Sequence, residues 1–121
     1  MINIAVIGYG YWGPNIVRNF NRTDGAKVLS VCDMNQHNLK RARKDYPSIQ
    51  TTSVCDDVMS SSEVDAIAVI TPVSTHFELA KKALKNGKHI FVEKPFTATV
   101  AEAEQLIELA EKKNLKIYFK R

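Results

Sequence analysis

Three glycines near the N-terminus have the spacing of a phosphate-binding turn. Gly8, Gly10 and Gly13 form the pattern G-x-G-x-x-G directly after the apolar run of residues 2–7. In such a turn the first glycine permits a tight bend, the second lets the backbone approach a pyrophosphate, and the third lets a helix pack closely on a strand. The N–H groups and the dipole at the start of that helix favour an anion. The pattern alone is a weak signal, because glycines occur in turns of every kind.

An acidic residue follows these glycines at the distance typical of dinucleotide-binding sites. Asp33 lies 20 residues after Gly13 (33 − 13) and comes directly after the apolar run of residues 26–32. A carboxylate at this offset accepts hydrogen bonds from ribose hydroxyls. It would also repel a 2′-phosphate, and residues 34–36 carry no positive charge. The sequence therefore predicts a dinucleotide site rather than a plain turn, and it favours NAD over NADP as the cofactor.

Two large aromatic residues, Tyr11 and Trp12, separate the second and third glycines. The main-chain N–H groups at these positions are expected to face phosphate, so both residues belong to the predicted cofactor site through their backbone. Their rings, together with that of Tyr9, are expected to fill a hydrophobic seam beside the turn. The backbone therefore matters more for binding here than the aromatic side chains do.

Polar residues also follow two later apolar runs. Thr71-Pro72 comes directly after residues 64–70, and Glu93-Lys94-Pro95 comes directly after residues 89–92. The carboxyl ends of parallel strands meet at one edge of a sheet, and ligands bind there. A lysine at that edge can transfer a proton to or from a substrate, whereas most lysines are simply solvated. The position of Lys94 favours the catalytic interpretation.

Apolar runs and helix signals alternate along the whole chain. Strands are expected at residues 2–7, 26–32, 49–53, 64–70, 89–92 and 116–119. Helices are expected after the glycine turn and after three candidate N-caps, Asn35, Thr75 and Thr99, of which the last two begin the capping-box pattern T-x-x-E. The last helix is expected to bury Val100, Ala103, Leu106, Ile107 and Ala110. This alternation predicts one doubly wound α/β domain over residues 1–121, with a parallel sheet between two layers of helices.

The composition is that of an ordinary globular domain with a positive net charge. Hydrophobic residues make up 45% and charged residues 25% of the 121 residues, and the formal net charge is +4. Basic residues concentrate at 81–88 and 112–121, a distribution typical of solvated faces, and no groove-entering motif accompanies them, so no nucleic-acid partner is expected. No run is long enough to cross a bilayer and the N-terminus lacks the pattern of a secretory signal. We therefore expect a cytoplasmic protein without a membrane partner.

The two cysteines, Cys32 and Cys55, lie far apart in the sequence. Neither belongs to a CxxC pattern, and no cluster of possible metal ligands surrounds either of them. Two buried or incidental thiols are therefore expected rather than a disulfide or a zinc site, and no metal site is predicted.

Two motifs in the second half of the chain, together with the glycine turn, carry a family resemblance. The segments GYGYWG, TP-x-x-x-H (Thr71, Pro72, His76) and EKP resemble the glucose-fructose oxidoreductase, inositol dehydrogenase and MocA family of NAD(P)-dependent oxidoreductases, over essentially the whole chain. The resemblance implies an NAD(P)-binding Rossmann fold and hydride transfer between a nicotinamide and a hydroxyl carbon of a sugar, nucleotide sugar or cyclitol. It also implies that Thr71, Pro72 and His76 line the cofactor, although His76 could simply form hydrogen bonds within the helix start. Glu93 and Lys94 would lie near the nicotinamide, with a cis Lys94-Pro95 bond and Lys94 moving the hydroxyl proton.

The chain departs from this family in its length. Family members continue into a second α/β domain that supplies the substrate pocket and usually an oligomer interface, so a homo-oligomer is implied. We do not expect that domain within these 121 residues, and a fragment or a truncated product is expected. A second interpretation is a stand-alone dinucleotide-binding module without turnover. In either case the chain is expected to expose an apolar patch and to self-associate through it.

Overall fold

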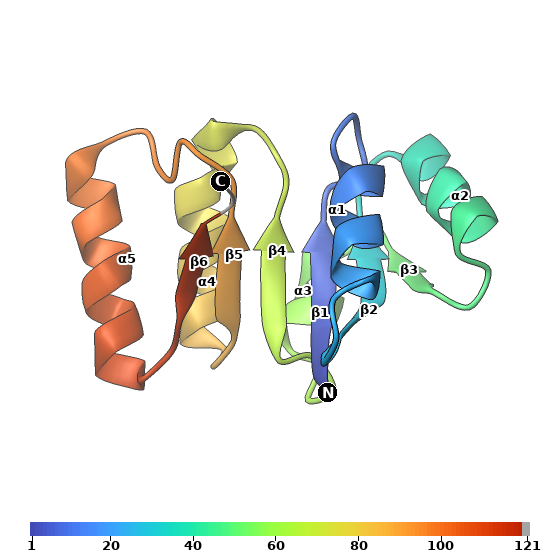
Figure 1. The fold of residues 1–121 in the computed structure, drawn as a ribbon. Coiled ribbons are helices and arrows are strands. Elements are labelled where there is room, and N and C mark those ends of the chain that lie inside the picture. The colour runs from blue at the N-terminus through green and yellow to red at the C-terminus, as the bar shows by residue number, and fades with distance from the viewer. Residues whose placement is uncertain (120–121) are drawn as a thin grey trace.

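The computed structural model describes residues 1–119, in which six parallel strands form a sheet (Figure 1). The strand order is β3-β2-β1-β4-β5-β6. The strands are β1 Ile2–Ile7, β2 Ala26–Cys32, β3 Gln50–Thr52, β4 Ala66–Val69, β5 His89–Val92 and β6 Ile117–Phe119. Each lies inside one of the expected runs, so the predicted strands are confirmed, with β3, β4 and β6 shorter than expected.

Helices cover both faces of the sheet. They are α1 Gly13–Asn21, α2 Gln36–Asp45, α3 Cys55–Met59, α4 His76–Lys85 and α5 Val100–Lys113. On one face α1 and α2 contribute Val17 and Leu39 to a core cluster with Val31 of the sheet. On the other face α4 and α5 contribute Leu84 and Leu106 to a cluster that also contains residues of α3. The predicted doubly wound α/β fold with three layers is confirmed.

Side-chain caps begin α2 and α5 as the sequence predicts. The Asn35 Oδ1 accepts hydrogen bonds from the amides of His37 and Asn38, at 2.9 and 3.2 Å. The Thr99 Oγ1 accepts one from the amide of Glu102, at 3.2 Å. Each cap satisfies an N–H group that the first turn of a helix leaves without an intrahelical partner.

The predicted capping box at Thr75 is wrong. A 3₁₀ turn, η1 Val73–Thr75, precedes α4, and Thr75 has helical backbone angles (φ −99°, ψ −10°) instead of the extended angles of a capping residue. Its Oγ1 turns back, donates to the carbonyl oxygen of Pro72 at 2.7 Å and lies 2.5 Å from the Oγ1 of Thr71. The hydroxyl therefore closes the loop after β4 and does not cap the helix.

The expected buried face of α5 is only partly correct. Leu106 and Ala110 are buried, but Val100 is 74% exposed and Ile107 is 45% exposed. The reason is that α5 lies beyond the edge of the sheet and packs along one side on α4 (Figure 1). A helix at the outer end of its layer buries a narrower stripe than its apolar residues would allow.

The short helix α3 was not expected from the sequence. It has five residues, and Val58 and Met59 are the two that are buried. A single turn contains too few residues for a helical period to be recognised. Within residues 1–119, none of the helices combines the length and the apolar character that a membrane span requires.

One lysine from the group expected on solvated faces is buried. Lys88 is 7% exposed, and its Nζ donates to the carbonyl oxygens of Ser61 and Val64, at 2.5 and 2.7 Å. The ammonium group thereby ties the loop before β4 to the start of β5. Two other members of the basic clusters, Lys120 and Arg121, lie outside the described residues.

The order of the strands creates a crevice beside β1. This strand pairs with β2 on one side and with β4 on the other, so the connections that follow these strands lead away in opposite directions. The loops after β1, β2, β4 and β5 all lie at one end of the sheet, at the top of Figure 1. In sheets of this type, ligands bind outside the carboxyl ends of the strands, at the point where the strand order reverses.

Candidate functional site

A cavity of 620 Å³ lies at this point of the sheet. Five residues predicted to bind a cofactor line it: Gly8, Gly10, Asp33, Thr71 and Pro72. The remaining lining residues are Ile7, Cys32, Met34, Cys55, Ile70, Ser74, Thr75, Glu78 and Leu79. Volumes of 300–1,000 Å³ are usual for cofactor and small-ligand sites, so the cavity can take a large part of a dinucleotide.

The three glycines of the turn differ in what a side chain would meet. Gly8 has φ +105°, and a Cβ there would lie 2.6 Å from the carbonyl oxygen of Ile70. A Cβ on Gly13 would lie 2.9 Å from the carbonyl oxygen of Gly8. A Cβ on Gly10, by contrast, would meet no atom within 4 Å. The fold therefore requires Gly8 and Gly13, whereas Gly10 leaves open space at the wall of the cavity.

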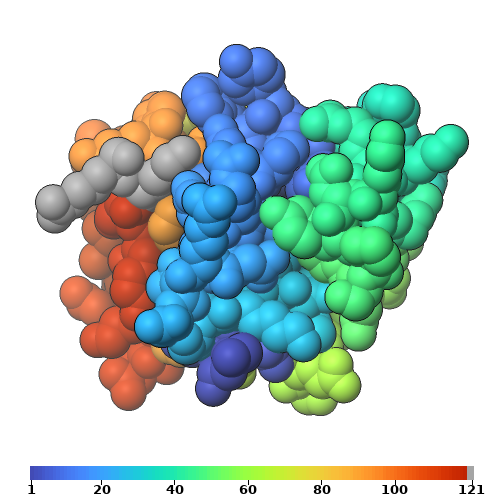
Figure 2. All heavy atoms as spheres, turned by 45° about the vertical axis from the view of Figure 1, so that its right-hand side comes forward, coloured from blue at the N-terminus to red at the C-terminus, as the bar shows by residue number. Residues whose placement is uncertain are grey.

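The turn stands out from the rest of the surface. In the space-filling view of Figure 2, the blue residues of the turn and of the start of α1 project at the top of the molecule. The green residues of α2 lie on one side of them and the orange and red C-terminal elements on the other. The N-terminus of a nine-residue helix is thus directed at the same end of the sheet as the cavity. This dipole favours a negatively charged group there.

The carboxylate of Asp33 is held against the glycine turn. Its Oδ2 accepts hydrogen bonds from the amide of Tyr9 at 2.8 Å and from the Nδ2 of Asn38 at 3.0 Å. Its Oδ1 accepts one from the amide of Asn35 at 2.8 Å. A carboxylate has about four acceptor positions, so about one stays available for a hydroxyl group in the cavity. Three fixed donors orient that remaining position before any ligand arrives.

The aromatic residues of the turn have two different environments. The ring of Tyr9 is fully buried and its hydroxyl donates to the Oδ2 of Asp45 at 2.7 Å, as expected for a residue that fills a seam. Burial, and then the carboxylate of Asp45, raise the pKa of Tyr9 above its ordinary value. Tyr11 and Trp12 are 85% and 50% exposed, and their rings contact each other at 4.9 Å. The seam expectation is therefore wrong for these two rings, because the turn directs them outward.

Positive charge is missing from the walls of the cavity. None of its lining residues, all within the described part of the chain, is lysine or arginine, whereas Asp33 and Glu78 are acidic. The guanidinium group of Arg41 lies over the ring of Tyr9, 5.8 Å from its centroid. The Nη1 of Arg43 donates to the Oγ1 of Thr51 at 2.9 Å. Both arginines of α2 thus interact with groups outside the cavity.

The imidazole of His76 lies behind the wall of the cavity. The residue is 3% exposed, its Nε2 lies 2.8 Å from the carbonyl oxygen of Thr71, and its Nδ1 lies 3.0 and 3.1 Å from the carbonyl oxygens of Pro95 and Phe96. The resemblance implied that it lines the cofactor, but it is not among the lining residues. Its partners also lie outside the helix start, contrary to the alternative expectation. His76 instead joins the loop after β4 to the loop after β5.

The EKP segment lies at the same edge of the sheet but outside the cavity. Val69 pairs with Val92 in the β4–β5 ladder, so the segments 70–72 and 93–95 leave the sheet at the same level. Lys94 is exposed, and the Lys94-Pro95 peptide bond is cis, as the resemblance implied. Glu93 is half-buried. The structure therefore brings this segment beside the cavity without making either charged residue part of its walls.

The two cysteines are neighbours in the folded chain. The Sγ atoms of Cys32 and Cys55 lie 3.4 Å apart, and both residues line the cavity. Burial, followed by the contact with Cys55, raises the pKa of Cys32 to about 12. Cys32 is buried and Cys55 is half-buried, and their thiols lie in contact. The strand order is the signal that could have revealed this, because the two residues lie at or just after the ends of the paired strands β2 and β3.

Comparisons with known proteins agree with this architecture. A family model described as an oxidoreductase family with an NAD-binding Rossmann fold matches residues 2–120. The uncharacterized oxidoreductase YhhX of Escherichia coli (strain K12) is 37% identical over 122 residues, which cover 97% of this chain and 34% of that protein. The glycosyl hydrolase family 109 protein 2 of Shewanella sp. (strain ANA-3) is 32% identical over 119 residues, 91% of this chain and 26% of that protein. The structure of apo scyllo-inositol dehydrogenase from Lactobacillus casei matches with a TM-score of 0.89 and 25% identity, covering 98% of this chain and 36% of that one.

These matches extend well beyond the glycine turn. The family model includes all six strands, the Asp33 position and both later motifs. The chain spans 26% and 34% of the length of the two curated relatives. The predicted family and the predicted Rossmann fold are therefore confirmed, and the chain belongs to the glucose-fructose oxidoreductase, inositol dehydrogenase and MocA family of oxidoreductases with an NAD-binding Rossmann fold.

Proposed function

We propose that this chain is the NAD-binding domain of an oxidoreductase that transfers a hydride between a nicotinamide and a hydroxyl-bearing carbon of a sugar, nucleotide sugar or cyclitol. The observation that carries the proposal is the position of Asp33, which lines the same cavity as Gly8 and Gly10 and is oriented by the turn itself. Its remaining acceptor position suits a ribose hydroxyl. The chain covers about a third or less of its curated relatives, so turnover belongs to the whole protein.

Different residues of the cavity would bind different parts of the cofactor. The amides of the glycine turn and the N-terminus of α1 would hold the pyrophosphate, and the open position beside Gly10 gives it room. Asp33 would accept from the adenosine ribose. Thr71 and Pro72 would form the wall toward the nicotinamide end. The bound nicotinamide supplies or accepts the hydride, and the protein orients the reacting groups.

The charge of the cavity supports NAD over NADP. Asp33 and Glu78 would both repel a 2′-phosphate, and the lining residues offer no cation to neutralise it. Arg41 and Arg43 interact elsewhere. Like charges close together in a partly enclosed site repel, so this arrangement favours the cofactor without the 2′-phosphate.

Lys94 is the proposed proton carrier. It is exposed at the carboxyl end of β5, next to the loop that lines the cavity, so its Nζ is accessible to a substrate placed over the nicotinamide. There it would accept the hydroxyl proton as the hydride leaves the carbon, or return it in the reverse direction. His76 would act on this chemistry indirectly, because it holds the carbonyl oxygen of Pro95 against the loop of Thr71.

The proposed substrate class comes from the relatives. One of them is named a glycosyl hydrolase and another is a scyllo-inositol dehydrogenase, so both names point to polyhydroxylated rings. A stand-alone dinucleotide-binding module remains the second interpretation, because it would use the same cavity residues. The two interpretations differ only in whether the whole protein also contains a substrate-binding domain.

Titration of the 121-residue chain with NADH and with NADPH tests the proposal. We expect NADH to bind the more tightly, and Asp33→Ala to weaken NADH binding about tenfold or more, which corresponds to about 1.4 kcal/mol. Asp24→Ala is the matched control, because Asp24 is an exposed aspartate outside the cavity. Tighter binding of NADPH, or equal binding of NADH by the Asp33→Ala variant, would contradict the cofactor assignment. Extending the reading frame beyond Arg121 and assaying polyol oxidation separates the enzyme from the stand-alone module.

A further inference from the structure

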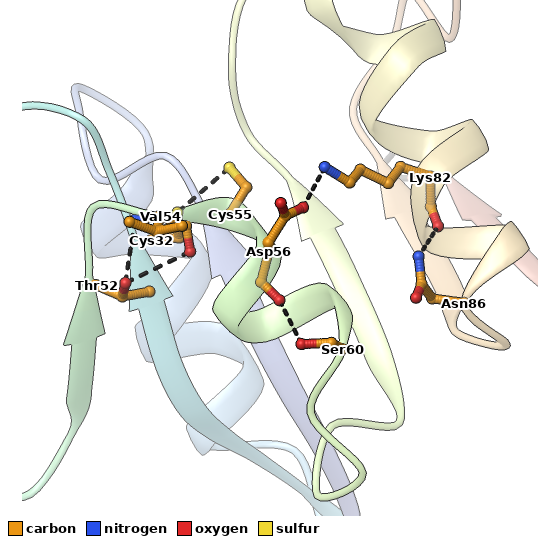
Figure 3. A network of polar contacts seen from close by, with 8 residues as sticks. All are labelled: Cys32, Thr52, Val54, Cys55, Asp56, Ser60, Lys82 and Asn86. Carbon is orange, nitrogen blue, oxygen red and sulfur yellow. Dashed lines mark hydrogen bonds and ion pairs between the residues drawn. The ribbon is translucent and has the colours of Figure 1, made fainter.

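The wall of the proposed cofactor cavity contains two thiols in contact. Cys32 is the last residue of β2 and Cys55 is the first residue of α3, and their Sγ atoms lie 3.4 Å apart (Figure 3). Cys32 is fully buried, and Cys55 is half-buried. A disulfide has a sulfur–sulfur distance of about 2.05 Å, so the two atoms would need to approach by only about 1.4 Å.

The backbone at Cys32 is held more firmly than the backbone at Cys55. Cys32 lies in a strand that pairs with both β1 and β3. Cys55 begins a helix of five residues that Val58 and Met59, toward its other end, anchor in the core. The Thr52 Oγ1 accepts from the amide of Val54 at 3.0 Å, and an exposed ion pair joins Asp56 to Lys82 (Figure 3). Exposed ion pairs contribute little stability, so the first turn of α3, which carries Cys55, is held less firmly than Cys32 is within its strand.

A metal site explains this pair less well than a disulfide does. Structural zinc takes four protein ligands. Within residues 1–119, no group of three or more His, Cys, Asp or Glu side chains is arranged to hold a metal ion. Two thiols in contact, without further ligands, are suited to direct bond formation.

We propose that Cys32 and Cys55 are an oxidisable pair whose disulfide forms in the wall of the cofactor cavity, and that a nucleotide bound in the cavity prevents its formation. The second part rests on the proposed function, because it requires the nucleotide to occupy the cavity that both cysteines line. To the extent that the nucleotide disfavours the disulfide at equilibrium, linkage requires the disulfide to weaken nucleotide binding by the same factor. The cavity would thus bind its cofactor most tightly in the reduced state.

A peroxide is the oxidant that fits this pair. The Cys55 thiol, the more accessible of the two, loses its proton, and its thiolate attacks one oxygen of hydrogen peroxide. The O–O bond breaks, a sulfenic acid forms, and the leaving hydroxide takes up the released proton as water. The sulfur of Cys32 then attacks the sulfur of Cys55, the S–O bond breaks, and the leaving hydroxide takes the Cys32 proton as water. Two thiols and one peroxide give one disulfide and two waters, so sulfur loses two electrons and peroxide gains them. The high pKa of the Cys32 thiol explains why Cys55 reacts first.

Oxidation of the 121-residue chain by hydrogen peroxide, with and without saturating NAD⁺, tests the proposal. Without nucleotide we expect loss of both thiols, a mass decrease of about 2 Da and a peptide that links Cys32 to Cys55. Because bound NAD⁺ would cover the cavity that both cysteines line, we expect it to slow the reaction with peroxide at least about tenfold. Separately, we expect the oxidised chain to bind NAD⁺ at equilibrium at least about tenfold more weakly. The Cys32→Ser variant, which lacks the resolving thiol, should stop at the sulfenic acid of Cys55.

The experiment tests the oxidisable cysteine pair and its protection by the nucleotide independently of each other. An intermolecular disulfide, or sulfinic acid without any disulfide in the nucleotide-free chain, would overturn the oxidisable pair whatever the cofactor does. NAD⁺ binding, measured independently by calorimetry on the reduced chain, tests the proposed function. If NAD⁺ binds but oxidation proceeds at the same rate, the protection by nucleotide is wrong. If NAD⁺ does not bind, the proposed function is wrong, and the reaction of the nucleotide-free chain still decides the pair.

Discussion

The backbone amide of Tyr9 donates a hydrogen bond of 2.8 Å to the Oδ2 of Asp33, a residue 24 positions later in the chain. The bond joins the two features that define the candidate site, the glycine turn after β1 and the acidic residue after β2. The same carboxylate accepts from Asn35 and Asn38 at the start of α2. Asp33 therefore organises the site even before it contacts a ligand.

Replacing Asp33 by asparagine should loosen the turn in the absence of cofactor. The amide side chain has one acceptor oxygen, so one of the three N–H donors would face another donor, at a cost of about 1–3 kcal/mol in the free energy of unfolding. Urea denaturation measures this loss, and hydrogen exchange should show faster exchange of the Tyr9 amide. Asp24→Asn should leave both measurements unchanged. Full protection of the Tyr9 amide in Asp33→Asn would show that the bond does not hold the turn.

The glycines of the turn should respond differently to alanine. At Gly8 the Cβ would meet the carbonyl oxygen of Ile70 and the positive φ would be strained, so Gly8→Ala should lose about 3 kcal/mol of stability or more. Gly10→Ala should fold with nearly wild-type stability, because nothing lies within 4 Å of the new Cβ. It should nevertheless bind NADH about tenfold more weakly, because the methyl group takes room needed by the pyrophosphate. Unchanged NADH binding by Gly10→Ala would place the phosphates elsewhere.

His76 should stabilise two loops at once. His76→Phe retains a ring but removes both nitrogens, so the carbonyl oxygen of Thr71 or of Pro95 that accepts the ring N–H loses its donor, which should cost about 1–3 kcal/mol in unfolding free energy. His37→Phe is the control, since His37 is exposed on α2. Thermal or urea unfolding compares the two variants. A loss in His76→Phe no larger than in the control would mean that the buried contacts contribute nothing.

Lys88 should behave as a structural residue in spite of its charge. In Lys88→Met the carbonyl oxygens of Ser61 and Val64 lose a charged donor, so the free energy of unfolding should fall by about 2–4 kcal/mol. Lys85→Met, at an exposed position of the same region, should change stability by less than about 0.5 kcal/mol. Denaturant titration of both variants gives the comparison. Equal stability of the two variants would contradict the assigned role of the buried ammonium group.

Local patterns predicted most of the fold because they act over short distances. The apolar runs located all six strands, and the caps at Asn35 and Thr99 follow from hydrogen bonds within one turn of helix. At Thr75 the local capping pattern predicted the wrong structure. Its sequence suits a cap, but a 3₁₀ turn before α4 gives it helical backbone angles and redirects its hydroxyl toward Pro72. The exposure of Val100 likewise depends on how many neighbours α5 has, which its own sequence does not encode.

By itself, the sequence determined the doubly wound fold, the glycine turn and the acidic residue that pairs with it, because strand period, helix caps and the offset between glycine and aspartate are properties of the chain. Only the tertiary structure decided which side chains from distant parts of the sequence contact each other. It placed His76 behind the cavity instead of in its wall, buried Lys88, and brought Cys32 into contact with Cys55. These contacts join residues between 5 and 27 positions apart through strand order and loop geometry, and no local pattern of residues specifies them.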